Sequence, residues 1–159
     1  MEHFYQTMLF NIRKHPNLEQ IIKFLAHYTP FITFIVYPLL IIYLYFTKNH
    51  LLPEIIICPL ISFCLVTILR KIFNRKRPYE KMNIKPLVKH KQGESFPSRH
   101  TVSAFAIAFA CLRFNFLLGI IMIVIATIIA CSRILCGVHY LSDVISAIII
   151  AFTIAHIEI

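Results

Sequence analysis

Residues 116–143 read FLLGIIMIVIATIIACSRILCGVHYLSD, a long apolar run followed by a short polar segment. Its apolar run is long enough to cross a lipid bilayer, because a spanning helix needs roughly 20 apolar residues and about 17 suffice. The run ends in Ser132 and Arg133, and His139 and Asp143 follow across a short connection. Ionisable side chains at the end of a membrane segment indicate a functional site. The stretch therefore predicts a helical membrane protein with polar chemistry at one face.

Similar apolar runs occupy most of the chain. Of its 159 residues 58% are hydrophobic and the mean hydropathy is +0.75, whereas a soluble domain is roughly half apolar. The runs predict an all-α fold, a polytopic transmembrane helix bundle. Its five expected spans cover residues 31–47, 51–70, 98–114, 116–134 and 138–157. We expect residues 1–159 to form a single integral-membrane domain.

The first 30 residues predict a different element. In residues 17–29, NLEQIIKFLAHYT, apolar side chains gather on one side of a helix. The apolar run is broken by Glu19, Gln20 and Lys23. This pattern is typical of an amphipathic helix in the membrane interface, so residues 1–30 are assigned to an interfacial helix. A sixth span in the first 28 residues is the alternative, which would place in lipid the costly residues Arg13, Lys14 and Pro16.

The order of the spans brings the polar segments to one face of the membrane. The 51–70 helix ends at the polar connection 71–97, from which the 98–114 helix begins. The 116–134 helix returns to that side, and the 138–157 helix leaves from it. All the polar motifs are therefore expected to meet at the same face.

Positive charge is concentrated in the same connection. The chain has 16 Lys and Arg against 7 Asp and Glu, a formal charge of +9, and nine of the cations lie between Arg70 and Lys91. Such a local basic surface fits anionic lipid or a phosphorylated substrate. Nucleic acid fits less well, because the basic segment is held between two membrane spans and has few aromatic residues for base stacking. We expect membrane lipids, and no nucleic acid, as partners.

His139 and Asp143 are four residues apart at the start of the last expected span, which places both side chains on one helical face. A carboxylate beside an imidazole fixes its tautomer and strengthens it as a nucleophile or base. The plainer alternative is an interfacial histidine with an aspartate that favours the helix dipole. Because Arg133 lies inside a membrane segment, where a charged residue usually has a function, the functional interpretation of the pair is favoured.

Residues 97–100, Pro-Ser-Arg-His, are typical of a helix start. Ser98 can cap the helix, and the free amides there attract anions, although a helix cap alone would not need His100. Arginine forks bind phosphate oxygens, so a phosphate-binding set is predicted: Arg70, Lys71, Arg77, Ser98, Arg99 and Arg133. Snorkelling toward the interface is preferred for Lys76, Lys81, Lys85, Lys89 and Lys91.

The remaining candidate residues carry little signal. The five cysteines have no metal-ligand spacing and are interpreted as small apolar residues: Cys58, Cys64, Cys111, Cys131 and Cys136. Six histidines have no potential catalytic or metal-binding partner at a recognisable spacing, and we expect them at the surface or interface: His3, His15, His27, His50, His90 and His156. Glu54, in the second span, has no assigned role.

Together these residues resemble the type 2 phosphatidic acid phosphatase superfamily of membrane lipid phosphatases, whose motifs are Lys-x6-Arg-Pro, Pro-Ser-Gly-His and Ser-Arg-x5-His-x3-Asp. The third motif matches at every defined position. The second has Arg99 where Gly is usual, and the first has Arg70 in the Lys position, followed by Lys71. The resemblance covers roughly residues 51–157, which would form the catalytic core.

The resemblance implies a mechanism. His139 would attack phosphorus to form a phosphohistidine, with Asp143 orienting it, and His100 would protonate the leaving oxygen and then activate water. The phosphate oxygens would be held by Arg70, Arg77, Ser98, the Arg99 amide and Arg133. No metal or other cofactor is expected, in keeping with Asp143 being the sole aspartate of the chain.

The leading hypothesis is a lipid phosphatase acting on undecaprenyl diphosphate, phosphatidylglycerophosphate or phosphatidate. The alternatives are a non-catalytic membrane protein that binds anionic lipid and a phosphatase of soluble phosphate esters. We expect the bacterial cytoplasmic membrane as the location, with the active site facing outward as the resemblance implies. The positive-inside rule would place the basic face in the cytoplasm, but cations recruited to bind phosphate distort that count.

Overall fold

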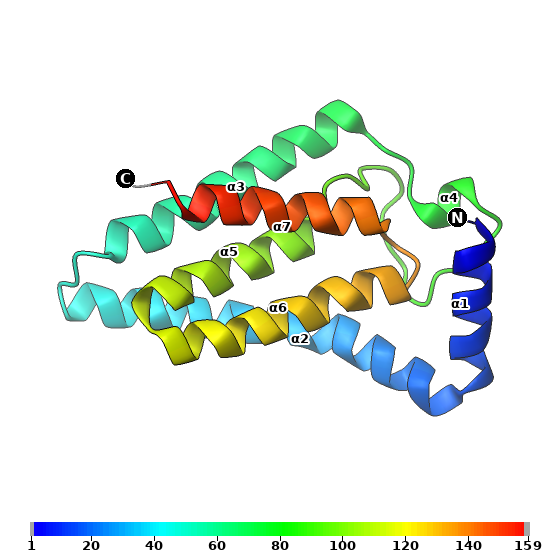
Figure 1. Cartoon of the computed structure of the whole chain (residues 1–159), viewed down its shortest axis with the longest axis horizontal. Helices are drawn as coiled ribbons and strands as arrows, with labels where there is room; N and C mark the ends of the chain where they lie inside the picture. Colours follow the sequence, from blue (N-terminus) through cyan, green and yellow to red (C-terminus); the bar gives the residue numbers. More distant parts are fainter. Residues whose placement is uncertain (1, 158–159) are drawn as a thin grey trace.

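The computed structural model describes residues 2–157, and every regular element within that range is a helix (Figure 1). The helices are α1 (Glu2–Lys14), α2 (Pro16–Phe46), α3 (Leu52–Phe73), α4 (Pro78–Lys81), α5 (Arg99–Phe114), α6 (Phe116–Leu135) and α7 (Leu141–Ala155). The predicted all-α fold is confirmed.

The surface of the bundle is apolar. Three helical segments have the length and composition of membrane spans: Pro16–Phe46, Leu52–Lys81 and Phe116–Leu135. Large apolar side chains point outward, among them Phe34 (70% exposed), Phe46 (77%) and Phe116 (74%). A surface of this kind suits lipid and not water. The chain is therefore an integral membrane protein.

Helix α5 forms the centre of the bundle, packed against α3, α6 and α7. It is only 16 residues long, and its buried positions are mostly small, for example Ala104 and Ala108. Gly119 lets α6 approach closely, because a Cβ there would lie 2.2 Å from the Cα of Leu112. Small residues at helix contacts are the usual means of tight packing in membranes.

Helix α2 runs without a break from Pro16 to Phe46, so the predicted boundary near residue 30 is wrong. Pro30 interrupts the helical hydrogen bonds without ending the helix. It has no N–H to give to the carbonyl of Ala26, and the guanidinium of Arg133 in α6 donates to that carbonyl instead. A membrane helix tolerates proline where a neighbouring helix satisfies the freed carbonyl in this way.

The same solution recurs in α3, where Pro59 lies inside the helix. The carbonyl of Ile55, one turn earlier, accepts a hydrogen bond of 3.0 Å from the hydroxyl of Tyr37 in α2. Two intrahelical prolines thus fasten α2 to its neighbours.

Helix α1 precedes α2 and lies across one end of the bundle (Figure 1), whereas residues 17–29, expected to form an amphipathic helix, belong to α2. Tyr5, Leu9 and Ile12 are buried, and Phe10 is exposed. The buried side packs on residues of the polar connections, including Leu87 and Val138. The expected interfacial segment 1–30 is therefore divided between α1 and the beginning of α2.

Helices α3, α5 and α6 begin and end close to the expected residues, whereas the short helix α4 lies within the 71–97 connection and was not expected. The last expected span starts at 138, whereas α7 starts at Leu141. Gly137, with φ of +71°, turns the chain, and residues 136–140 form a loop. This loop, the 71–97 connection and the start of α5 lie at the same end of the bundle (Figure 1), as the span order predicts.

Candidate active site

His139 lies in the loop between α6 and α7 and is fully buried. Its Nδ1 is 3.4 Å from Oδ2 of Asp143, and its Nε2 is 3.3 Å from Nη1 of Arg77. Both contacts are satisfied when Nδ1 carries the proton and Nε2 accepts from Arg77. The structure therefore brings the predicted pair together, although His139 precedes α7 and does not lie on it.

Burial controls the protonation of His139. Desolvation lowers its pKa to about 4, against the opposing effect of the hydrogen bond to Asp143. The imidazole is consequently neutral near pH 7, with a lone pair on Nε2. A neutral imidazole oriented by a carboxylate is the form that acts as a nucleophile.

Asp143 is held from several sides. Its Oδ1 is 2.7 Å from Nη1 of Arg75, and its Oδ2 accepts from the Ser95 hydroxyl at 2.5 Å and from the Tyr140 amide at 2.9 Å. The Arg75 guanidinium also lies over the Tyr140 ring, 4.1 Å from its centre. Sequence reasoning missed the roles of Arg75 and Ser95, because no spacing indicates which loop residues reach α7.

Arg77 joins the two polar connections. It is 1% exposed, and it donates to the carbonyls of Val138 at 2.9 Å and Gly93 at 3.1 Å. Burial lowers its pKa, partly offset by Tyr79 and nearby carboxylates. A guanidinium fixed beside Nε2 of His139 is well placed to hold a phosphate that the histidine attacks.

Two further arginines of the predicted set surround the same region. Arg70 donates to the Pro97 carbonyl at 3.0 Å and lies 3.7 Å from Glu94. Arg133 donates to Ala26. In both side chains Nε is buried and has no hydrogen-bond partner among the described residues.

The start of α5 is as predicted, but the Ser98 hydroxyl does not cap the helix. It accepts a hydrogen bond of 2.9 Å from Thr101. The Ser98 amide donates to the Asp143 carbonyl at 3.0 Å, which ties the start of α5 to α7.

His90 belongs to the site, and its expected place at the surface or interface is wrong. Its ring centre is 5.7 Å from that of His100 and 6.2 Å from that of His139. Burial is the main reason that the His90 pKa falls to about 3, with Arg77 acting in the same direction. Its only sequence signal was its position in the 71–97 connection.

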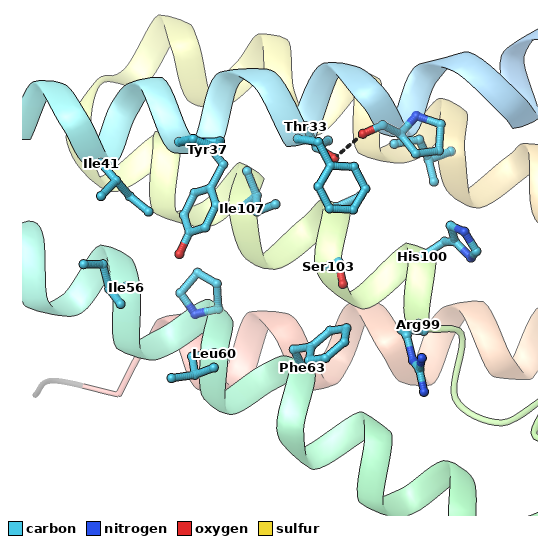
Figure 2. Close-up of a pocket in the computed structure, with 16 residues that line it drawn as sticks. Thr33, Tyr37, Ile41, Ile56, Leu60, Phe63, Arg99, His100, Ser103 and Ile107 are labelled. Carbon is cyan, nitrogen blue, oxygen red and sulfur yellow. Dashed lines mark hydrogen bonds between the residues drawn. The ribbon is translucent and has the colours of Figure 1, made fainter.

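Two cavities meet at His100. One, of about 320 Å³, is lined by the candidate site residues His90, His100 and Arg133. The other, of about 460 Å³, is an apolar groove between α2, α3 and α5 (Figure 2). Pro30, Phe34 and His100 line both, so the groove leads from the lipid-facing side of the bundle to His100 and His90.

Two predicted residues point elsewhere. Lys71 is exposed at the end of α3. Figure 2 shows the Arg99 side chain leaving α5 on the side of Phe63, away from His100. Among residues 2–157, no group of three or more His, Cys, Asp or Glu side chains could hold a metal ion. Glu54 forms an ion pair of 2.8 Å with Arg113.

The chain is similar to known proteins in both sequence and fold. A family model described as the PAP2 superfamily matches residues 51–159. The bacitracin transport permease protein BcrC of Bacillus licheniformis is 33% identical over 138 residues, 83% of this chain and 66% of that protein. The undecaprenyl-diphosphatase BcrC of Bacillus subtilis (strain 168) is 32% identical over 83 residues, 52% of this chain and 43% of that protein. The chain thus spans 66% and 43% of the lengths of these relatives.

Solved structures share the fold. The crystal structure of Aquifex aeolicus LpxE has a TM-score of 0.76 and 25% identity, covering 96% of this chain and 90% of that one. A transmembrane PAP2 type phosphatidylglycerolphosphate phosphatase from Bacillus subtilis has a TM-score of 0.69 and 21% identity, covering 96% and 81%. The family match covers well over half of the chain and all three motifs, and the chain therefore belongs to the PAP2 superfamily.

Proposed function

We propose that the chain is a membrane lipid phosphatase that hydrolyses a phosphomonoester or diphosphate lipid through a phosphohistidine on His139, without a metal. One observation carries this proposal. The buried, neutral imidazole of His139 is oriented by Asp143 at 3.4 Å and turns Nε2 toward the cation of Arg77 at 3.3 Å. This arrangement presents a nucleophile where a bound phosphate would sit.

In the first step, Nε2 of His139 forms a bond to phosphorus while the bond from phosphorus to the leaving oxygen breaks. His100 supplies the proton that the leaving oxygen takes up. In the second step, His100 accepts a proton from water, the water oxygen attacks phosphorus, and the P–N bond breaks. The products are orthophosphate and the dephosphorylated lipid, and both histidines return to their starting forms.

The charge that develops on the phosphate oxygens is stabilised by Arg70, Arg77 and Arg133, together with the Ser98 hydroxyl and the Arg99 amide at the start of α5. The unpartnered Nε atoms of Arg70 and Arg133 support this assignment, because a buried donor without an acceptor is costly. Arg75 and Ser95 hold Asp143 and thereby position His139.

The substrate is a lipid because the groove continues the site into the membrane-facing surface. Undecaprenyl diphosphate and phosphatidylglycerophosphate are the first candidates, since related proteins are described as an undecaprenyl-diphosphatase and a phosphatidylglycerolphosphate phosphatase. Phosphatidate is the third. The whole chain acts as one phosphatase domain.

In this proposal α2, α3, α5, α6 and α7 cross a bacterial cytoplasmic membrane, α1 lies in the interface, and the site faces outward. A Lys85→Cys variant tests the orientation, because Lys85 is exposed in the 71–97 connection. Labelling of intact cells by a membrane-impermeant thiol reagent is expected. Labelling only after the cells are opened would overturn the outward orientation.

The activity is tested by phosphate release from purified full-length protein in detergent with EDTA present. The three lipids and a soluble phosphate ester serve as substrates, and His139→Ala is compared with His50→Ala, an exposed histidine outside the site. Release from lipid that is lost only in His139→Ala supports the proposal. Equal release from the soluble ester would favour a soluble-ester phosphatase, and lipid binding without release would favour a binding protein.

A further inference from the structure

Arg99 stands apart from the other arginines at this end of the bundle. Its side chain lines the apolar groove with Phe63, and its guanidinium lies 5.5 Å from the centre of that ring. It does not line the cavity that contains His90 and Arg133. Its Nε is buried and has no partner, and the described residues give its side chain no hydrogen bond or ion pair.

A half-buried arginine whose Nε is buried without an acceptor is unfavourable, and here a second cation makes it more so. The charge of Arg99 acts on Arg70, whose ion pair within residues 2–157 is a long one, to Glu94 at 3.7 Å. An anion between Arg99 and Arg70 would relieve both the repulsion and the missing hydrogen bonds.

The place of such an anion follows from the two cavities. A lipid whose terminal phosphate lies between His139 and His100 must pass its remaining headgroup by His100 into the groove, because His100 lines both spaces. Arg99 is the next residue on α5, and its side chain lies in the groove on the side of Phe63 (Figure 2).

The following inference rests on the proposed function. We propose that Arg99 binds the inner phosphate of a diphosphate lipid, which is the phosphate bonded to the lipid chain. His139 attacks the outer phosphate. In the reaction the bond from the outer phosphorus to the bridging oxygen breaks, and the leaving group is the lipid monophosphate. With water, the balance is lipid diphosphate to lipid monophosphate and orthophosphate. Arg99 stabilises the negative charge that grows on the departing monophosphate, so it selects diphosphates over monoesters.

The test compares farnesyl diphosphate with farnesyl monophosphate, which share one chain, and adds phosphatidylglycerophosphate, whose second phosphate is three carbons away. The variants are Arg99→Gly, which restores the residue usual in the motif, and Arg99→Lys, which keeps the charge. Arg113→Gln is the matched control, because Arg113 lies at the end of α5 far from the site in sequence and pairs with Glu54.

The measured quantity is the ratio of kcat/KM for the diphosphate to that for the monophosphate. Loss of a charge-assisted hydrogen bond predicts that Arg99→Gly lowers this ratio roughly 10- to 100-fold. Arg99→Lys should lower it less, Arg113→Gln should not change it, and phosphatidylglycerophosphate should follow the monophosphate. An unchanged ratio in Arg99→Gly overturns the proposal. So does an equal fall in both rates, which would mean a general role in folding or phosphate binding.

Failure of the proposed function would look different. In that case the wild-type protein would release no phosphate from any of these lipids beyond the His139→Ala background. A wild-type protein that hydrolyses both farnesyl substrates, with a ratio insensitive to Arg99, would leave the phosphatase intact and reject only the inner-phosphate site.

Discussion

Arg133 of α6 donates a hydrogen bond to the main-chain carbonyl of Ala26, the carbonyl that Pro30 leaves without its helical donor in α2. A residue of the phosphate-binding motif is thus oriented by a defect in a helix more than a hundred positions earlier in the chain. The defect gives α2 a role in the site, even though the family motifs begin only after it.

Replacement of Pro30 by Ala tests this link. Alanine supplies the missing N–H, which competes with Arg133 for the Ala26 carbonyl. We expect kcat/KM to fall roughly 5-fold, the value of about one hydrogen bond, while the apparent melting temperature in detergent does not fall. Pro53→Ala, an exposed proline at the start of α3, is the control and should change neither quantity. Unchanged kinetics in Pro30→Ala would show that Arg133 does not need this contact.

Arg75 should matter through Asp143. Its Nη1 lies 2.7 Å from a carboxylate that is 0% exposed, so Arg75→Gln leaves a buried charge with weaker support. We expect kcat to fall about 10-fold. The acid limb of the pH–rate profile should also move to higher pH, because the Asp143 charge, no longer offset by Arg75, stabilises the protonated form of His139 more strongly. Lys76→Gln, a change at a neighbouring exposed cation, serves as the control. A rise in KM alone would mean that Arg75 contacts substrate instead.

The pH dependence of kcat/KM follows from His139. Its pKa is lowered by burial to about 4, and the imidazole must be neutral to attack. Protonation therefore removes activity only as the pH falls toward 4, well below the ordinary value near 6.5. Asp143→Asn removes the hydrogen bond that raises this pKa, so its acid limb should move lower while kcat drops roughly 10²- to 10⁴-fold. Both proteins are measured on one substrate, so its ionisation cancels. If the acid limb of the profile stays at the same pH in Asp143→Asn, the group that titrates there is not His139.

Tyr5 connects α1 to the loop of residues 136–140, which contains His139. Its hydroxyl donates to the carbonyl of His139 at 3.0 Å in a buried setting. Tyr5→Phe leaves that carbonyl without a partner, and we expect kcat to fall about 5-fold through misplacement of His139. The exposed Tyr28→Phe is the matched control. Equal activity of the two variants would mean that the loop holds His139 without help from α1.

Gly119 is expected to be important for the stability of the protein and not for its catalytic activity. A Cβ at this position would lie 2.2 Å from Cα of Leu112, so Gly119→Ala must separate α5 from α6. Overpacking of this kind typically costs roughly 1–3 kcal/mol. A lower melting temperature in detergent is expected, whereas Val124→Ala on the exposed side of α6 should have little effect. A melting temperature that does not change in Gly119→Ala would show that the two helices can part freely.

Much of the site could be predicted because its chemistry is local. The pairs His139–Asp143 and Ser132–Arg133, and the run from Pro97 to His100, are close in sequence, so only a short length of chain separates the members of each. The apolar runs likewise predict helices, since a spanning segment must satisfy its own backbone hydrogen bonds.

The missed features depend on contacts between distant segments. Whether Arg75 or Lys76 reaches Asp143 is decided by the path of a long connection. His90 enters the site by the same path. Pro30 suggests a helix end in sequence, and only the guanidinium of Arg133 explains why α2 continues. The direction of the Arg99 side chain is set by the packing of α3 against α5, which no motif encodes.

The proposed mechanism requires that His139 becomes phosphorylated, and this intermediate can be trapped. Full-length His100→Gln protein is mixed with farnesyl diphosphate carrying ³²P in its outer phosphate, quenched in alkali, digested and mapped by mass spectrometry. The account predicts a phosphorylated peptide containing His139, present in His100→Gln because hydrolysis of the intermediate is slowed and absent when His139 is also replaced by Ala. Phosphate release by the wild-type protein with no label on protein, or with label on another residue, would contradict it.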